Sequence, residues 1–336
     1  MLDIMGNMDI GFPNLGLYLK DLPSGFSVFG FWIAFYGICI AIGVMAGILM
    51  AARMAKVTGQ NPEIYWDFAI YAIIFSVIGA RLYYVAFEWD YYKNDLMQIF
   101  NTRNGGLAIY GAVIGAFLTG FVYCKIKKLN PLQIIDTGVY GLILGQAIGR
   151  WGNFFNREVF GGYTDGLFAM RIPVSAVRDR SDITADIAAH MSESTNYIQV
   201  HPTFLYESVW NLLVLGAMLL YRKRQKFHGE IMLLYLGGYG LGRFIIEGIR
   251  TDRLLIPGTD IAVSQLLALI CFVGAIIADV VVRIVLKKKG INPMTTNFPE
   301  KVEESGAEST EKEENATENT EEVEETLSID ENDESK

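Results

Sequence analysis

The sequence is poor in the residues that build disulfide frameworks and metal sites. It contains 3 cysteines and 3 histidines among 336 residues. Cys39, Cys124 and Cys271 lie within or beside apolar runs at unrelated spacings, which excludes a disulfide framework, a CxxC redox pair and a cysteine zinc site. We therefore interpret each cysteine as a small buried apolar residue, and we expect neither a metal ion nor a cofactor.

Two further signals are absent. The first 26 residues contain no basic segment followed by an apolar core and a cleavage site, so we expect no signal peptide. The chain also shows no fixed-period repeat and no inverted pair of spans broken by glycine or proline. This absence disfavours the two-fold repeats on which many transporters are built.

Long apolar runs dominate what the sequence does contain. Hydrophobic residues make up 51% of the chain, and the mean hydropathy is +0.28. They gather in seven runs, each close to the ~20 residues that a helix needs to cross a bilayer. The pattern predicts an all-α integral membrane protein with seven transmembrane helices. The runs cover approximately residues 28–52, 64–87, 105–124, 132–149, 204–221, 231–249 and 262–286.

The charges beside these runs predict their orientation. The first, third, fifth and seventh runs end in clusters of lysine and arginine, such as Arg222–Lys226 and Lys287–Lys289. By the positive-inside rule, the N-terminus lies outside and the C-terminus in the cytoplasm. The expected organisation is then an extracytoplasmic or interfacial segment (1–27), a seven-span domain (28–290) with a small extracytoplasmic head segment (about 150–203), and a cytoplasmic tail (291–336).

The tail carries most of the negative charge. Glu300–Lys336 holds 16 acidic and 3 basic side chains, a local charge of −13, which leaves +4 for the rest of a chain whose formal charge is −9. With almost no large apolar residues, the tail is predicted to be disordered. The mildly basic membrane body suits an anionic lipid partner better than nucleic acid, although the positive-inside bias alone would supply the same excess.

The most unusual stretch is GRWGNFFNREVFGG, residues 149–162, at the end of the fourth run. An arginine at this depth costs about 2.5–3.5 kcal/mol on insertion scales, so it normally has an anionic partner or a function. Around Arg150, glycines permit close backbone approach, while Asn153 and Asn156 add uncharged donors. Glu158 is either a general base or the partner of the neighbouring arginine. We interpret the stretch as a lipid-headgroup clamp; plain helix capping is the alternative.

A second intramembrane arginine, Arg243, lies in the outer half of the sixth run, one helical turn before Glu247. Two arginines near one leaflet can bind a phosphodiester through charge-assisted, often bidentate hydrogen bonds. The alternative is a structural Arg243–Glu247 ion pair, with Arg150 extending to the headgroup zone. Further candidates fall at the same outer level: Gly105, Gly106 and Tyr110 at the start of the third run, His201 before the fifth, and Tyr36 in the first.

These residues carry a resemblance to a known family. The stretch GRWGNFFNRE (149–158) is similar to the signature of the bacterial phosphatidylglycerol–prolipoprotein diacylglyceryl transferases, and residues 104–111, 201–207 and 238–247 resemble the family's other motifs in the same order. The resemblance covers about residues 28–286 and leaves the tail outside. It implies a multi-pass enzyme of the bacterial cytoplasmic membrane that binds phosphatidylglycerol, other membrane lipids and the lipobox signal peptides of prolipoproteins.

The implied reaction moves the diacylglyceryl group of phosphatidylglycerol onto the thiol of the lipobox cysteine, the first step of lipoprotein maturation. It leaves a thioether and releases glycerol 1-phosphate. Negative charge collects on the departing phosphate, where Arg150 and Arg243 would stabilise it in a low-dielectric site. The resemblance implies catalytic roles for Arg150, Arg243, Tyr110 and Glu158, and contacts with phosphatidylglycerol for Tyr36, Gly105, Gly106, Asn153, Asn156, His201 and Glu247 in addition to the two arginines.

One position departs from the family pattern. Tyr110 stands where many family members have a histidine that has been proposed as the base. A phenol is protonated at neutral pH and is a poor base. Tyr110 then acts as a hydrogen-bond partner, or the base is His201 or Glu158, or the field of the arginines makes a dedicated base unnecessary. His201, directly before a proline, also fits the simpler role of a structural cap.

The main alternative is a transporter or channel for an anionic solute, with the two arginines lining its path. It predicts polar residues through the full depth of the membrane, whereas the polar cluster here lies in the outer half. Asp136, Gln146 and Asp279 weaken that contrast without reversing it. A receptor or scaffold that binds partners through the outer segment would leave the buried arginines unexplained.

Overall fold

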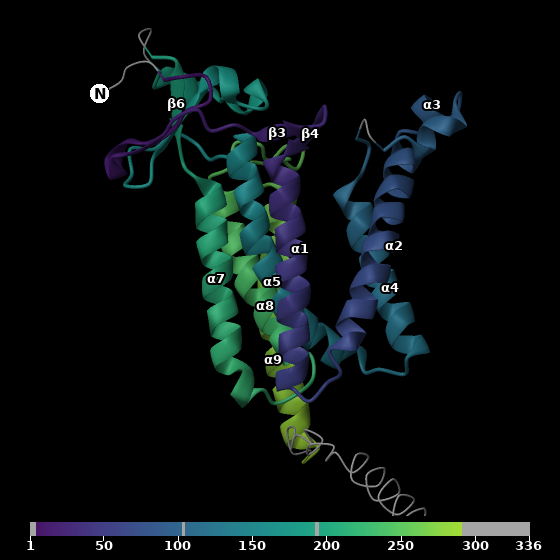
Figure 1. Cartoon of the computed structure of the whole chain (residues 1–336). Coiled ribbons are helices and arrows are strands. Elements are labelled where there is room, and N and C mark those ends of the chain that lie inside the picture. The colour runs from purple at the N-terminus through teal and green to yellow at the C-terminus, as the bar shows by residue number, and fades with distance from the viewer. Residues whose placement is uncertain (1–4, 103–104, 192–194, 291–336) are drawn as a thin grey trace, which may run out of the picture. The chain divides into compact units, whose positions relative to one another are not determined.

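The computed structural model describes residues 5–102, 105–191 and 195–290, and this part of the chain is mostly helical (Figure 1). Two predictions fall outside the described residues. They are the disordered tail at 291–336 and the position of Asn104, which opens one of the motifs.

Seven helices of 18 residues or more occur in the described part of the chain, and each coincides with one predicted run. Five of them, α1, α2, α4, α7 and α9, are long and apolar enough to cross a membrane. A mostly helical, multi-pass membrane protein is thus confirmed, while the number of seven spans and their orientation stay predictions. The helices are α1 (Phe35–Val57), α2 (Glu63–Phe87), α4 (Ile109–Ile126), α5 (Pro131–Asn156), α7 (Thr203–Tyr221), α8 (Glu230–Glu247) and α9 (Val263–Lys288).

The short elements build two small antiparallel sheets, one ordered β2-β1-β5-β6 and the other β3-β4. In the first sheet Gly11 pairs with Arg171, so the N-terminal segment and the head segment share one sheet. Ile10, Ile172 and Ile198 are fully buried in its core. The strands are β1 (Ile10–Phe12), β2 (Leu17–Leu19), β3 (Gly25–Val28), β4 (Phe31–Ala34), β5 (Met170–Pro173) and β6 (Tyr197–Val200). The short helices are α3 (Trp89–Tyr92) and α6 (Ala185–Ala189). The 3-10 turns lie at Pro13–Leu15, Leu96–Phe100, Val174–Ala176, Arg180–Asp182 and Arg222–Arg224.

The first long helix begins later than the sequence predicts. The predicted run starts near Val28, but α1 starts at Phe35 and a β3–β4 hairpin precedes it (Figure 1). Val28 pairs with Phe31 across a two-residue turn, in which Phe29 and Gly30 have φ angles of 49° and 80°. Such turns need positive φ at both central positions, and glycine adopts it without strain. Because the hairpin is also apolar, hydropathy alone does not separate its residues from the helix that follows.

Helices α1 and α5 pack backbone to backbone. A Cβ atom at Gly43 would lie 2.9 Å from the carbonyl oxygen of Gly145, and one at Gly47 would lie 2.8 Å from that of Gly141. In apolar surroundings, small residues four positions apart let two helices approach closely enough for continuous van der Waals contact. This contact fixes α5, whose C-terminal end carries the 149–162 stretch, against α1.

A buried carboxylate ties the other end of α5 to α8. Asp136 accepts hydrogen bonds from the backbone N–H groups of Gly229 (2.6 Å) and Met232 (2.8 Å) and from the side-chain amide of Gln225 (2.7 Å). The first turn of a helix leaves N–H groups without intrahelical partners, and its dipole favours a negative charge there. Asp136 therefore caps α8 and sets its depth beside α5.

Candidate active site

A buried glutamate on α7 joins the two predicted arginines. Oε2 of Glu207 lies 2.6 Å from Nη2 of Arg150 in α5, and Oε1 lies 3.1 Å from Nη1 of Arg243 in α8. Only 4% of the Glu207 side chain is exposed, so its negative charge depends on these partners. The structure thus brings arginines from two helices to one carboxylate.

Glu247 extends this contact into a network. Nη2 of Arg243 lies 2.7 Å from Oε2 of Glu247, one turn along the same helix, and Ser264 of α9 donates a hydrogen bond to the other carboxylate oxygen. Nη1 of Arg250 lies 3.7 Å from the carboxylate of Glu207 and 3.6 Å from that of Glu247. The ionic network therefore joins α5, α7, α8 and α9.

The network ends at Asp252. Arg250 donates from Nε to Oδ1 of Asp252 (2.9 Å) and from Nη2 to Oδ2 (2.6 Å). Burial opposes the charge on Asp252, but the pairing with Arg250 outweighs it and holds the pKa of Asp252 below its usual value. Three positive and three negative side chains therefore balance, and the network is neutral as a whole. Its members are Arg150, Arg243, Arg250, Glu207, Glu247 and Asp252.

Three loops meet where Arg250 enters the network. Gly161 forms a β-bridge with Arg250, Gly162 donates its N–H to the carbonyl of Ile249 (2.9 Å), and His201 donates its N–H to the carbonyl of Gly162 (3.0 Å). A Cβ atom at Gly161 would lie 2.8 Å from the Ile249 carbonyl oxygen, so this approach requires glycine. The paired glycines thus join the loops after α5 and α8 to the start of α7.

An apolar cavity of about 640 Å³ lies between α1, α2 and α5 and includes Arg150 in its wall. Tyr36 and Asn153 line the same end of the cavity. A Cβ atom at Gly152 would lie 2.8 Å from the Tyr36 ring, so glycine here makes room for the tyrosine. Among the described residues, Nε and Nη1 of Arg150 have no hydrogen-bond partner, which leaves these donors for a ligand.

Glu158 belongs to a separate cluster. Its Oε1 accepts hydrogen bonds from the side-chain amides of Asn153 (2.9 Å) and Asn156 (3.2 Å), and its Oε2 lies 3.2 Å from Nε of Arg178. Of the two alternatives for Glu158, pairing with Arg157 is therefore wrong, because the arginine partner comes from the head segment. Asn153 connects this cluster to the cavity wall.

Arg157 instead holds the N-terminal segment. Its guanidinium donates hydrogen bonds to the carbonyl oxygens of Phe155 (3.0 Å), Met8 (2.8 Å) and Leu22 (2.5 Å). Burial lowers the pKa of Arg157, yet three carbonyl acceptors compensate for the loss of water. Arg157 thus anchors the N-terminal segment of the chain to the end of α5 through hydrogen bonds.

His201 has a mainly structural position. Its backbone carbonyl accepts the N–H of Gly161 (3.0 Å), and Nδ1 of its ring lies 3.2 Å from the hydroxyl of Tyr206. Partial burial lowers the pKa of His201 and favours the neutral imidazole. The side chain does not line the cavity beside Arg150.

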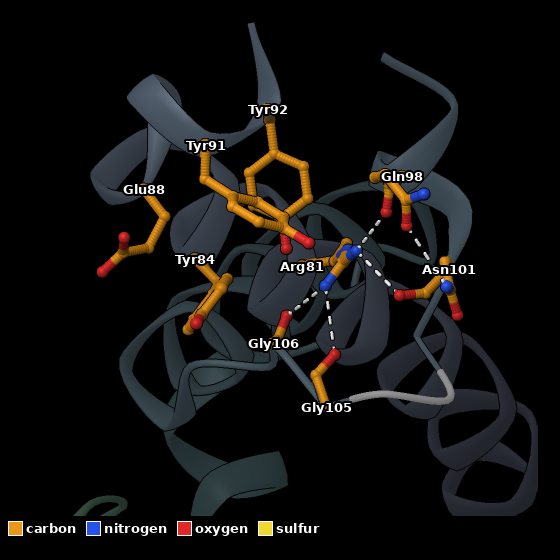
Figure 2. Close-up of a pocket in the computed structure, with 9 residues that line it drawn as sticks. All are labelled: Arg81, Tyr84, Glu88, Tyr91, Tyr92, Gln98, Asn101, Gly105 and Gly106. Carbon is orange, nitrogen blue, oxygen red and sulfur yellow. Dashed lines mark hydrogen bonds between the residues drawn. The ribbon is translucent and has the colours of Figure 1, made fainter. Parts of the chain in front are cut away.

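Gly105 and Gly106 face Arg81 and not the ionic network, as Figure 2 shows. Nη1 of Arg81 donates to the carbonyl oxygens of Gly105 (3.1 Å) and Gly106 (2.8 Å), and Nε and Nη2 donate to three further carbonyls within residues 98–101. All five N–H groups of the guanidinium are used, and its Cζ lies 5.1 Å from the centre of the Tyr92 ring. Arg81 thus shapes the loop that leads into α4.

Tyr110 lies apart from these clusters. It is the second residue of α4, is 60% exposed, and has its ring 6.3 Å from that of Tyr83. Its neighbour Ile109 lines the cavity, whereas Tyr110 does not. Within the described residues no hydrogen bond or ion pair joins Tyr110 to the network.

Three members of the network were missed from the sequence. Glu207 ends one of the motifs, and an acid inside an apolar run needs a cationic partner, so a signal for it was present. Arg250 and Asp252 follow α8 in a loop, where charged residues are ordinary. Nothing in the local pattern marks them, because their partners come from other helices.

Comparison with known proteins adds an independent observation. The chain matches the family model described as prolipoprotein diacylglyceryl transferase over residues 23–281. It is 42% identical to the phosphatidylglycerol–prolipoprotein diacylglyceryl transferase of Clostridioides difficile over 255 residues, which cover 76% of this chain and 93% of that protein. The proteins of the same name from Finegoldia magna and Staphylococcus haemolyticus are 40% and 38% identical, over 79% and 82% of this chain and 95% and 94% of theirs.

Proposed function

Because the chain belongs to the prolipoprotein diacylglyceryl transferase family, we propose that it transfers the diacylglyceryl group of phosphatidylglycerol to the thiol of a lipobox cysteine in prolipoproteins. The protein is a transferase, and this reaction is the first step of lipoprotein maturation. The observation that carries the proposal is the position of Arg150, which belongs both to the buried ionic network and to the wall of the apolar cavity. A phospholipid combines the matching features, an anionic headgroup and long acyl chains.

The reaction exchanges one bond to carbon for another. The cysteine sulfur forms a bond to the glycerol carbon that bears the phosphate, and the bond from that carbon to the phosphate oxygen breaks. Its electron pair stays on the oxygen, so the products are the diacylglyceryl thioether, glycerol 1-phosphate and the proton of the thiol. Negative charge grows on the leaving phosphate during this step, and a cationic donor placed there lowers the barrier.

Arg150 is the group that we assign to this charge. Glu207 holds one of its nitrogens, which orients the guanidinium and leaves the other N–H groups for the phosphate. Arg243 shares the same carboxylate and is the second proposed phosphate partner, with Glu247 orienting it. Because both arginines are already fixed and largely buried, little reorganisation is needed when the charge develops.

The remaining site residues divide by what they contact. Tyr36 and Asn153 line the cavity beside Arg150 and would offer a hydroxyl and an amide to the glycerol of the headgroup. Asn156 donates a hydrogen bond to the carboxylate of Glu158 and would support headgroup binding by holding Glu158 beside Asn153. Gly105, Gly106 and His201 would support phosphatidylglycerol binding through the loops that they fix.

We propose that deprotonation of the thiol relies on the field of the arginines. Among the described residues that line the cavity, none of the three candidate bases, Tyr110, Glu158 and His201, is present. A cation close to a thiol lowers its pKa and increases the fraction of reactive thiolate. Arg150 is the cation in the cavity wall that can act in this way.

The proposed topology places this chemistry on the outer face of the bacterial cytoplasmic membrane. The basic residues Arg222–Arg224 and Lys287–Lys288 lie at the C-terminal ends of α7 and α9. Glu207 lies near the opposite end of α7, and by the positive-inside rule that end is extracytoplasmic. All seven long helices would then span the membrane, with the N-terminus outside, the C-terminus in the cytoplasm, and the substrate cysteine arriving from the outer side.

A transporter for an anionic solute is less well supported. The deeper polar groups that it would use are engaged in contacts within the fold. Asp136 caps α8, the amide of Gln146 donates to the hydroxyl of Tyr235 (3.0 Å), and Asp279 accepts from Arg283 on the same helix (2.7 Å). These contacts stabilise helix packing or neutralise charge, which favours the transferase.

The proposal is tested with purified protein, phosphatidylglycerol vesicles and a peptide that contains a lipobox cysteine. Mass spectrometry of the peptide should show the added diacylglyceryl group as a thioether. Arg150→Ala should lower the rate by about 100-fold or more, the usual effect of losing a donor to a developing anion. Arg171→Ala, which removes an arginine that stacks on Tyr197 in the head segment, is the matched control and should remain active.

Two outcomes would contradict the proposal. The absence of thioether with the correctly folded wild-type protein would refute the activity. Undiminished product from folded, membrane-inserted Arg150→Ala would refute the assigned site while leaving the family membership intact.

A further inference from the structure

The cavity beside Arg150 is deeper than a headgroup requires. Along α5 its lining runs from Asn153 to Gly138, and the fifteen steps between these positions span about 22 Å at 1.5 Å per residue. The hydrocarbon of one leaflet is roughly 15 Å thick, half of the ~30 Å core. The cavity therefore reaches beyond the depth of one leaflet, which suits an extended acyl chain.

At the end of the cavity far from Arg150, the ring of Tyr65 packs in a buried cluster with Ala51 and Ile134. Tyr65 of α2 lines the cavity and is 3% exposed. Its hydroxyl donates to Oε1 of Gln60 (2.6 Å), and Nε2 of Gln60 donates to the hydroxyl of Thr137 on α5 (2.7 Å). These two hydrogen bonds tie the ring to the facing helix, and Ala51 and Gly138 complete this cavity floor.

Gly138 differs from the other five glycines of the cavity wall. Gly43, Gly47, Gly141 and Gly145 are required by the close packing of α1 against α5, and a Cβ atom at Gly149 would touch Ile40. A Cβ atom at Gly138 would meet no atom within 4 Å. Helix packing therefore gives no reason for glycine at position 138, whereas the open space at the cavity floor does.

We propose that this cavity holds one acyl chain of the phospholipid whose phosphate Arg150 binds, and that Tyr65 and Gly138 set the longest chain that fits. The identity of the lipid rests on the proposed function. With the phosphate fixed at Arg150, the methyl end of the chain points to the cavity floor, so chain length and cavity length must match. A shorter chain leaves apolar wall uncovered, and a longer one meets the ring of Tyr65.

The test adds a side chain at position 138, where it would occupy the end of the cavity without altering the contact between α1 and α5. Wild type, Gly138→Ala and Gly138→Leu are given equal amounts of dimyristoyl and distearoyl phosphatidylglycerol with a lipobox peptide, and the two thioether products are compared by mass spectrometry. Gly138→Leu should shift the product ratio toward the dimyristoyl species by roughly tenfold, which corresponds to 1.4 kcal/mol of selectivity. Gly138→Ala should shift it less in the same direction.

Gly216→Leu is the matched control. Gly216 lies on α7 outside the cavity, and a Cβ atom there also meets no atom within 4 Å. This variant adds the same side chain to another helix and should keep the wild-type ratio. An equal shift in Gly216→Leu would show that the added bulk acts on the protein in general, which would overturn the proposal.

Lipid binding separates the length limit from catalysis. Native mass spectrometry of the purified variants with the same lipid mixture should show the same shift in bound species. If the binding shift occurs but even wild type forms no thioether, the proposed function fails and the length limit stands. If both Gly138→Leu and Gly138→Ala keep the wild-type ratios, the cavity does not limit the length of the acyl chain. The same conclusion follows if product forms in the wild-type ratio although the ratio of bound lipids shifts.

Discussion

Glu207 has the widest influence of any single residue in the site. Its carboxylate is shared by Arg150 and Arg243. Buried ionic groups are tolerated when every charge is paired, and removing one partner is costly because the others stay buried without compensation. A phosphodiester that binds the free N–H groups of Arg150 adds negative charge to a neutral network, so the phosphate and Glu207 contact different nitrogens but compete for the same positive charge.

This competition gives a prediction for Glu207→Gln, which keeps the shape and removes the charge. The variant should lose about 3–5 kcal/mol of stability, the usual cost of breaking a buried pair. Phosphatidylglycerol should then raise its Tm more than that of wild type, because the phosphate replaces the missing charge. Thermal unfolding in detergent, with and without lipid, measures both effects; Glu63→Gln, at an exposed acid, is the control. Equal stabilisation by lipid in all three proteins would contradict the prediction.

His201 should make stability depend on pH. Burial lowers the pKa of His201 in the folded protein, while the unfolded chain takes up the proton near the ordinary value of about 6.5. Stability is therefore fully present above that pH and falls as the pH decreases below it. Between about pH 7 and about pH 5.5, the Tm of wild type should fall more than that of His201→Gln. Matching slopes for wild type and His201→Gln would argue against this role of burial.

Tyr110→Phe tests whether the hydroxyl at this position takes part in catalysis. We expect most of the transfer activity to remain, because Tyr110 does not line the cavity and its hydroxyl has no hydrogen-bond partner among the described residues. Initial rates of thioether formation provide the measurement. Complete loss of activity in a folded Tyr110→Phe protein would show that the hydroxyl is essential.

At the scale of helices and strands, the sequence predicted where the long helices lie along the chain better than which of them pack together. Seven apolar runs predicted the seven long helices found in the described part of the chain, because each run is close to the length of a membrane-spanning helix. The same apolar character concealed the β3–β4 hairpin at Phe29 and Gly30, because a count of hydrophobic residues does not register a turn. The pairing of α1 with α5 was not predicted either, since its glycines become informative only when the facing helix is known.

The glycine contact between α1 and α5 can be tested at one position. Gly47→Ala should lower the Tm and cost about 1–3 kcal/mol, the usual effect of overpacking, because its Cβ atom would lie 2.8 Å from the carbonyl oxygen of Gly141. Gly37→Ala changes the same helix where a Cβ atom meets nothing within 4 Å, so its Tm should match wild type. If the two variants unfold at the same temperature, the close packing does not stabilise the protein.

At the scale of the whole molecule, the sequence indicated where charge gathers but not how it is arranged. Arg150 and Arg243 were expected at one level of the membrane, and the structure brings both to one carboxylate. The links through Glu207, Arg250 and Asp252 could not be derived, since they join α5, α7 and the loop after α8, which are separated along the chain. The sheet shared by the N-terminal segment and the head segment was not predicted for the same reason.

The proposed topology predicts which surfaces a membrane-impermeant thiol reagent reaches. Ser181→Cys, in the head segment, should be labelled in intact cells, whereas Arg224→Cys, beyond the end of α7, should be labelled only after permeabilisation. The difference follows from the basic clusters that keep α7 and α9 in one orientation. The parent protein provides the background from its three native cysteines, and the opposite labelling pattern would invert the assigned orientation.

The pairing of Gly11 with Arg171 also has a consequence for biosynthesis. Strand β1 is made early, but its neighbour β5 emerges from the ribosome only after α1, α2, α4 and α5 have been synthesised. In the proposed topology all four helices cross the membrane, so a failure of one of them to insert would make the number of crossings odd and leave the two strands on opposite sides of the bilayer. With that topology, the sheet forms only when β1 and β5 lie on the same side of the membrane, so its formation depends on the insertion of the helices between them.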